Sequence, residues 1–217
     1  MKKLLILPLL TAFAIAQNSN NNEKILVKIS KDISSINTTD NGHKVKISRV
    51  QDSDNVLTDD YTKTSRACPP FCIQPTKIDK NIQNIEELEL LSFIQNKVTK
   101  NRGILVDSRL KSWFELETIP SSINIPYTAL QNQPRAKVQK IFKALGMKIK
   151  TDKTWDFSNV KELAIFDNGV WCKQAQYFVE ALLKYNYPTS KLSYYRSGFQ
   201  GWKLVGLTTI VHKEIVK

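Results

Sequence analysis

The sequence predicts an α/β fold in which a parallel sheet is covered by helices and preceded by a small β-rich N-terminal element. Three short apolar runs, at residues 103–109, 162–167 and 191–196, have the length and composition of buried strands. Helical patterns at residues 134–146 and 173–186 alternate with these runs. Apolar strands separated by helices of this length are typical of parallel sheets, because each crossover places a helix on one face of the sheet.

The first sixteen residues, MKKLLILPLLTAFAIA, are predicted to be a secretory signal peptide. Lys2 and Lys3 precede a largely apolar run, and small residues at 14–16 supply a cleavage site. The run is too short to cross a bilayer, which takes about 20 apolar residues. We therefore expect a cleaved signal peptide, a periplasmic or otherwise exported chain without a membrane span, and a disordered polar tether at residues 17–22.

Residues 23–79 are expected to form the β-rich element. Alternating apolar and polar residues predict strands at 23–30 and 41–51, and the second of these starts at an Asn-Gly turn signal. The Pro-rich segment at 57–84 contains the stretch RACPPFCIQP and is unsuited to a helix or a central strand. It predicts an ordered loop between two units.

The rest of the chain, residues 80–217, is expected to be the α/β domain. It opens with a helical stripe of apolar residues at 85–98. A short strand at 122–126 follows the first buried strand, and the next helix ends at Gly146. The last elements are expected to be a short helix at 198–206 and a strand at 208–211.

The composition limits the classes of molecule that the protein is expected to bind. The formal charge of +12 falls to +10 when Lys2 and Lys3 are removed with the signal peptide. A charge of this size favours anionic partners, although the lysines are scattered as on a solvated surface. No cluster of basic and aromatic residues indicates nucleic acid binding. Two histidines and three cysteines do not indicate a closed metal site, and no cofactor is expected.

The three cysteines are Cys68, Cys72 and Cys172. In an oxidising compartment an odd number implies one pair and one free thiol, or a redox-active set. Cys68 and Cys72 are expected to form a disulfide, although the two prolines between them restrict how the thiols approach each other. A reactive pair, and a contact with Cys172, remain as alternatives.

Three stretches, taken in order, resemble rhodanese-like domains. LVDSRLKSWFELETIPSSINIP, at 105–126, resembles the first signature of that family, in which an Asp-x-Arg pair closes a strand. YYRSGFQGWKLVGLT, at 194–208, is similar to the closing signature, with Gly198 and Trp202 in place and Ser197 where the family has glycine. The loop DNGVWC, at 167–172, lies where the active-site loop of the family belongs. The resemblance covers about residues 80–212 and implies the rhodanese fold.

The resemblance also gives expectations for single residues. Asp107 and Arg109 are expected to fix the end of a strand, as an ion pair, rather than to catalyse. The extension with Cys-Pro-Pro-Phe-Cys resembles the N-terminal part of an exported, single-domain subgroup. In rhodaneses a cysteine at the strand exit carries sulfane sulfur as a persulfide, and in this chain Asp167 stands at that position. A carboxylate cannot form a persulfide, so the usual transfer at this position is expected to be lost.

The remaining loop residues are expected to form an anion cradle, because backbone N–H groups at a helix N-terminus bind anions. The cradle residues are Asn168, Gly169, Val170, Trp171 and Lys173, with Arg196 adding positive charge. Cys172 is the candidate nucleophile, since the helix start and Lys173 would favour its thiolate. Alternatively, Cys172 is a small residue that packs the helix on the sheet, and Asp167 fills the cradle itself.

Two functions are therefore compatible with the sequence. The first is a protein related to thiosulfate or persulfide sulfurtransferases, whose sulfur or thiol-redox chemistry uses Cys172. Its partner would be a small sulfur-containing anion or a thiol acceptor. The second is an inactive rhodanese-fold module that binds an anion or a periplasmic protein.

Overall fold

The computed structural model describes residues 25–212, so the predicted signal peptide and tether at residues 1–22 lie outside the described residues. The strands are β1 (Ser35–Asp40), β2 (His43–Ser48), β3 (Gln83–Ile85), β4 (Gly103–Asp107), β5 (Ser122–Asn124), β6 (Lys148–Ile149), β7 (Trp155–Asp156), β8 (Glu162–Phe166) and β9 (Leu192–Tyr195). The α-helices are α1 (Glu87–Phe93), α2 (Lys111–Leu116), α3 (Arg135–Ala144), α4 (Gln174–Lys184) and α5 (Gly198–Leu204).

The centre of the molecule is a parallel sheet of five strands in the order β3-β9-β8-β4-β5. The prediction of a parallel α/β sheet is therefore confirmed. Alternate residues of β8 face opposite sides: Leu163 and Ile165 belong to one core, and Ala164 and Phe166 to the other. A central strand that is buried on both faces is apolar throughout, which is why the sequence shows it as a continuous apolar run.

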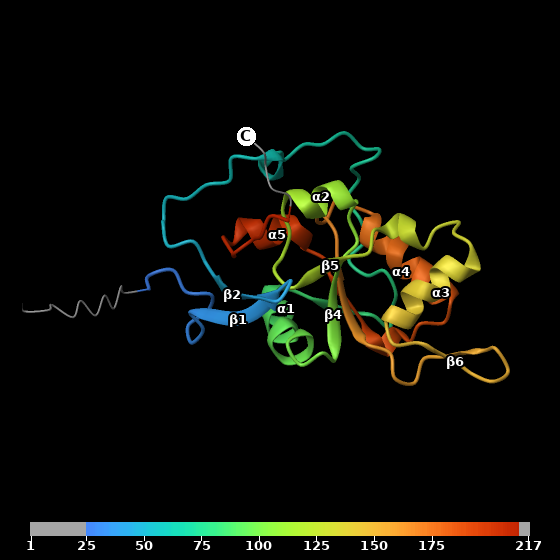
Figure 1. The fold of residues 1–217 in the computed structure, drawn as a ribbon. Coiled ribbons are helices and arrows are strands. Elements are labelled where there is room, and N and C mark those ends of the chain that lie inside the picture. Colours follow the sequence, from blue (N-terminus) through green and yellow to red (C-terminus); the bar gives the residue numbers. More distant parts are fainter. Residues whose placement is uncertain (1–24, 213–217) are drawn as a thin grey trace, which may run out of the picture.

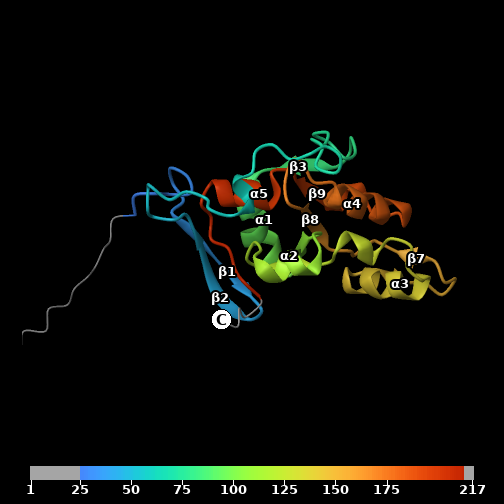
Figure 2. The ribbon, with the colours of Figure 1, turned by 90° about the horizontal axis from the view of Figure 1, so that it is seen from above.

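Helices cover both faces of this sheet (Figures 1 and 2). The first core lies under α3 and α4 and includes Phe142 and Phe178. The second core lies under α1 and α5 and includes Leu90 and Trp202. Ile47 of β2 belongs to the second core as well, so the N-terminal hairpin packs on the same face as α1 and α5. Over residues 25–212, none of the helices is long and apolar enough to cross a membrane.

The N-terminal hairpin differs from the prediction in its first strand. The predicted strand at 23–30 is wrong over its described part, since residues 25–30 form no strand. Instead β1 and β2 pair in antiparallel fashion across Asn41 and Gly42, which both have positive φ (44° and 83°). A two-residue turn of this kind joins strands that adjoin it directly, so the partner of β2 has to end at Asp40.

Three further elements of secondary structure differ from the predictions. The stripe at 85–98 is helical only from α1 onwards and continues as a π-helix over Ile94–Val98, while β3 precedes it as an edge strand. Helix α2 was not expected from the pattern at 111–116. The predicted strand at 208–211 is reduced to an isolated bridge between Thr118 and Ile210.

Residues 57–82, which we call the strap, contain no strand and only one 3₁₀ turn, at Asp60–Thr62. This matches the ordered loop expected at 57–84 as far as residue 82, after which β3 begins. In Figure 1 the strap, coloured cyan to teal, runs over the top of the molecule from the side of the hairpin towards the side of α4. It therefore crosses from one helical layer of the domain to the other.

Candidate functional site

The site loop, residues 167–172, joins the end of β8 to the start of α4. It is anchored by the first turn of α5, because the backbone N–H of Phe199 donates to the carbonyl of Asp167 (2.8 Å). This contact needs glycine at 198, which has a φ of +59°. A Cβ atom on Gly198 would lie 2.6 Å from the backbone nitrogen of Gly169. The match of Gly198 to the closing signature thus reflects the close approach of two backbones.

Asp167 is completely buried and occupies the N-terminal end of α4. Its Oδ1 atom accepts a hydrogen bond from the backbone N–H of Gly169 (3.1 Å), and its Oδ2 atom accepts one from that of Ala175 (2.9 Å). Burial nevertheless raises the pKa of the Asp167 carboxyl to about 6, against the opposing effect of these two donors. The carboxylate therefore takes up two of the backbone donors around the start of α4, one of which, from Gly169, belongs to the predicted anion cradle.

Cys172 lies at the other end of the loop and is only 8% exposed. The side-chain amide of Asn168 donates to its Sγ atom (3.7 Å). Burial, and then the charge of Asp167, raise the pKa of the Cys172 thiol to about 12. The sequence predicts a stabilised thiolate here, whereas in the structure desolvation and the neighbouring carboxylate outweigh the helix terminus and Lys173, so the thiol is protonated at neutral pH.

The strap packs directly on the site loop. The backbone N–H of Gln74 donates to the carbonyl of Val170 (2.8 Å). The ring of Phe71 meets that of Trp171 edge to face, with 5.5 Å between the centroids, and the guanidinium of Arg66 lies 4.5 Å from the Trp171 ring centroid. These contacts explain how a segment without regular structure keeps a defined position.

Strap, site loop and α4 enclose a cavity of about 860 Å³. Among its lining residues are Asn168, Trp171, Cys172 and Lys173 of the predicted site, together with Cys72 of the strap. The ammonium of Lys173 lies 5.1 Å from the Tyr177 ring centroid, at the wall of this cavity. The structure therefore brings Cys172 and Cys72 to one cavity, although they are 100 residues apart in the sequence.

Cys68 and Cys72 form a disulfide, and Cys172 is a free thiol. Cys68 is exposed, Cys72 is half-buried and Cys172 is buried. The pairing is the one expected from an odd number of cysteines in an oxidising compartment. The three sulfur-bearing residues thus form a series from the surface of the strap to the floor of the cavity.

Arg196 does not line this cavity. Its guanidinium donates instead to the carbonyls of Gln74 (3.0 Å) and Pro75 (3.4 Å). The expectation that Arg196 adds positive charge to the pocket stays a prediction, since hydrogen bonds to carbonyls leave the guanidinium charged. Its position fixes the strap next to the site loop.

A buried polar network also supports the loop and includes Tyr61 of the strap. Arg109 and Asp107 form an ion pair (2.6 Å) with both side chains almost fully buried, as the Asp-x-Arg pattern predicts. Arg109 also donates to the hydroxyl of Tyr61 (3.0 Å), which in turn donates to Oδ1 of Asn168 (2.7 Å). The sequence analysis missed Tyr61, because a lone tyrosine in an irregular segment carries no periodic signal.

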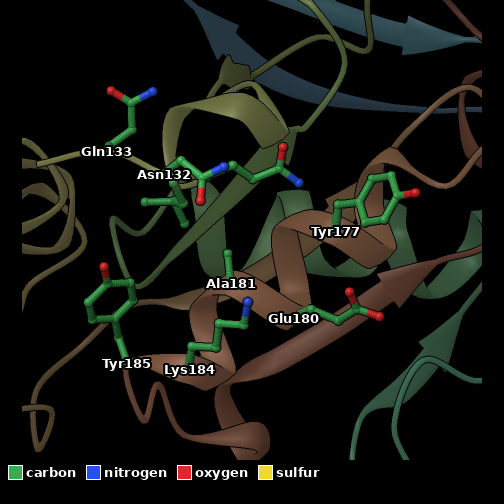
Figure 3. Close-up of a pocket in the computed structure, with 9 residues that line it drawn as sticks. Asn132, Gln133, Tyr177, Glu180, Ala181, Lys184 and Tyr185 are labelled. Carbon is green, nitrogen blue, oxygen red and sulfur yellow. The ribbon is translucent and has the colours of Figure 1, made fainter.

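Other parts of the molecule add little to the site. A second cavity, of about 730 Å³, lies between the segment at 130–133 and α4 and is shown in Figure 3. Tyr177 borders both cavities, but no cysteine lines the second one. Within residues 25–212 no three His, Cys, Asp or Glu side chains are grouped so that they could hold a metal ion.

Several solved structures resemble the chain at low identity. Thiosulfate sulfurtransferase from Pseudomonas aeruginosa is 13% identical with a TM-score of 0.44, over 62% of this chain and 21% of the other. A single-domain sulfurtransferase of Saccharomyces cerevisiae is 19% identical with a TM-score of 0.40, over 58% of this chain and 91% of the other. A human single-domain sulfurtransferase is 18% identical with a TM-score of 0.38, over 56% and 95%. The chain thus spans about a fifth of the Pseudomonas protein.

No curated protein matches the chain. The family model of the rhodanese-like domain matches residues 88–204, which is more than half of the sequence. This range runs from α1 to α5 and contains the whole site loop, whereas the strap precedes it. The chain belongs to the rhodanese-like domain family.

Proposed function

We propose that this protein is an exported rhodanese-like sulfur carrier whose thiol chemistry takes place at Cys172 and not at position 167. The observation that carries the proposal is the cavity that Cys172 shares with Cys72 and Lys173. Two positively charged side chains, Arg66 and Lys173, line this cavity and favour an anionic ligand there.

Transfer from thiosulfate at position 167 is disfavoured by the contacts of Asp167. The backbone donors of Gly169 and Ala175 already serve its carboxylate, and a second anion there would face a like charge. At 4 Å, two unit charges repel by about 4 kcal/mol at an effective dielectric constant of about 20. The proposal therefore places the sulfur donor in the cavity outside the loop, near Lys173 and Arg66.

The raised pKa of Cys172 sets the expected rate of loading. At neutral pH a thiol with a pKa of about 12 forms about 10³ times less thiolate than one with the ordinary value of 9.0. The more basic thiolate is a better nucleophile and recovers about 20-fold, so loading should be roughly 50-fold slower than at an ordinary thiol. It should accelerate about tenfold for each unit of pH above neutrality, until the pKa of the thiol is approached.

The test is intact-mass measurement after incubation with polysulfide or with thiosulfate, followed by peptide mapping. We expect an added sulfur on Cys172 with polysulfide, at a rate that rises with pH. Cys172→Ser is the matched control and should acquire none. If the Cys172→Ser variant takes up sulfur as fast as the natural protein, the proposal is wrong.

A second function has its own supporting observation. Phe71 and Ile73 of the strap are 39% and 80% exposed beside the cavity, and apolar groups at such a position favour a protein partner. On this alternative the protein is an inactive rhodanese-fold module that binds a periplasmic protein. Turnover of thiosulfate by an Asp167→Cys variant, together with no persulfide on the natural protein, would favour this alternative over the carrier.

Export is a separate part of the proposal and is based on residues 1–16 of the sequence. Fractionation of the producing cells, with N-terminal sequencing of the recovered protein, tests it. A protein that begins near residue 17 and is found outside the cytoplasm is the expected result. An intact N-terminus in the cytoplasmic fraction would contradict it.

A further inference from the structure

We propose that Cys72 and Cys68, when reduced, form an internal dithiol that discharges a sulfane sulfur from Cys172 and releases it as sulfide. This inference rests on the proposed function of Cys172 as a sulfur carrier. It assigns a chemical role to the strap, which lies outside the matched rhodanese-like domain. It also names the reductant that releases the sulfur as a pair of thiols within the same chain.

The placement of Cys72 over the site loop is the first argument. Two contacts bracket Cys72: the ring of Phe71 packs on Trp171, and the amide of Gln74 bonds to Val170. Trp171 is the residue immediately before Cys172. Cys72 and Cys172 line the same cavity, and Cys68 does not.

The contacts that follow Cys72 lie outside the ring that the disulfide closes. The N–H of Gln74 donates to Val170, and Arg196 donates to the carbonyls of Gln74 and Pro75. Phe71 lies inside that ring and meets Trp171 through its side chain. Gln74 and Pro75 therefore tie the segment after Cys72 to the loop without using the disulfide. Of the two cysteines of the strap, only Cys72 lines the cavity that Cys172 also lines.

The first step is attack of the Cys72 thiolate on the Sγ atom of a Cys172 persulfide. A Cys72–Cys172 disulfide forms, the bond between Sγ and the sulfane sulfur breaks, and that sulfur leaves as hydrosulfide. Attack on the outer sulfur would instead expel the Cys172 thiolate. The leaving group of lower pKa departs faster, and the pKa of the buried Cys172 thiol is raised to about 12, so expulsion of hydrosulfide is favoured.

In the second step the Cys68 thiolate attacks the Sγ atom of Cys72, because Cys68 does not line the cavity that holds Cys172. Position therefore decides this step, although Cys172 is the leaving group of higher pKa. The Cys68–Cys72 disulfide forms, which is the pairing in the structure, and Cys172 leaves and takes up a proton. Overall, two thiols lose two electrons and two protons, and the sulfane sulfur gains them as hydrogen sulfide. A dithiol reductant from outside then reduces the pair again at Cys68, which is exposed.

A trapping experiment with two single variants tests the order of the steps. Cys68→Ser keeps Cys72 and Cys172, and Cys72→Ser keeps Cys68 and Cys172. After treatment with polysulfide and removal of the excess, Cys68→Ser should contain a Cys72–Cys172 disulfide, identified by non-reducing peptide mapping. Cys72→Ser should retain the persulfide on Cys172. A Cys68–Cys172 disulfide in Cys72→Ser, with none in Cys68→Ser, would overturn the assignment of Cys72.

A rate measurement tests the function of the pair. The natural protein in its disulfide form and a Cys68→Ser/Cys72→Ser double variant are loaded with polysulfide, desalted and mixed with one equivalent of dithiothreitol. Sulfide should appear at least about tenfold faster from the natural protein, because the internal thiol is positioned and the buried persulfide is shielded from the reagent. Unfolding of the double variant is compared with that of the reduced natural protein, since both lack the disulfide.

The outcomes separate this inference from the proposed function. Equal rates of sulfide release, with a persulfide mapped to Cys172 in both proteins, would overturn the internal dithiol and leave the carrier function standing. Absence of a persulfide on Cys172 in every variant would overturn both. The single variants carry the test if the double variant does not fold.

Discussion

Asp167→Asn isolates the effect of a buried charge on the stability of this fold. The Asp167 carboxyl is fully buried, and its pKa lies at about 6 instead of the ordinary 3.8. The folded state therefore binds the proton more tightly than the unfolded state does. The stability that this group contributes is fully present below about pH 3.8 and is lost as the pH rises through about 6.

The size of the change in stability follows from the difference between the two pKa values of Asp167. From 3.8 to about 6 the free energy of unfolding should fall by about 3 kcal/mol, since each pKa unit is worth about 1.4 kcal/mol. Asparagine has a similar shape and does not titrate. It keeps one acceptor for the N–H groups of Gly169 and Ala175, so its own cost of about 1 kcal/mol is independent of pH.

The assay is urea unfolding of both proteins at several pH values from about 4 to about 7. The variant should gain about 3 kcal/mol relative to the natural protein over this range. Asp152→Asn is the flat control: hydrogen bonds from Thr154 lower the pKa of that exposed carboxyl below the ordinary 3.8, so its removal should give almost no pH-dependent difference over this range. Parallel pH profiles for the natural protein and Asp167→Asn, or a difference of the opposite slope, would refute the account of the buried charge.

Three more outcomes can be measured. Asp167→Asn should also speed the alkylation of Cys172 by iodoacetamide at neutral pH, because the carboxylate charge contributes to the raised pKa of the thiol. Mass spectrometry follows the reaction, and an unchanged rate would contradict this expectation. Arg109→Met should cost about 3–5 kcal/mol in urea unfolding, since it leaves its partner carboxylate buried and unpaired; a cost below about 1 kcal/mol would show that the pair is dispensable. Gly198→Ala should lower the thermal midpoint more than Gly42→Ala, because both have positive φ but only the former meets backbone atoms within 3 Å; equal shifts would mean that backbone strain alone is at work.

The central strands and α4 were predictable because buried positions carry apolar residues, which form a recognisable pattern in the sequence. β4, β8 and β9 are buried on both faces and appear as apolar runs, and α4 carries its apolar stripe towards one core. β3 gave no such signal, since it is an edge strand of three residues of which only Ile85 is buried. β1 was missed because two of its residues that face inwards are Ile36 and Thr38, and a threonine in that position breaks the apolar alternation.

The site was predictable only in part, for a related reason. The loop residues are contiguous, so the resemblance located Asp167 and Cys172 together. The contacts between the strap and the site loop join segments about 100 residues apart. No local sequence pattern indicates that Cys72 lines the same cavity as the loop. The raised pKa of the Cys172 thiol could not be predicted from the sequence either. The direction of the shift depends on how deeply Cys172 is buried and on where the Asp167 charge lies, and not on the position of Cys172 near a helix start.

Asp167 has a further consequence for where an anion can bind. A helix N-terminus attracts an anion through its unpaired N–H groups, but here the Asp167 carboxylate already accepts the N–H of Ala175 in the first turn of α4 and that of Gly169 in the loop. The nearest positive charges that remain are Lys173 and Arg66, and both line the cavity outside the loop. An anionic sulfur donor would therefore be held at the outer wall, beside the ring of Trp171, and would reach Cys172 from the side of the strap. On this geometry the strap governs access to the thiol, and Lys173→Gln should weaken loading by polysulfide while leaving the thermal midpoint nearly unchanged, because Lys173 is exposed and forms no ion pair among the described residues.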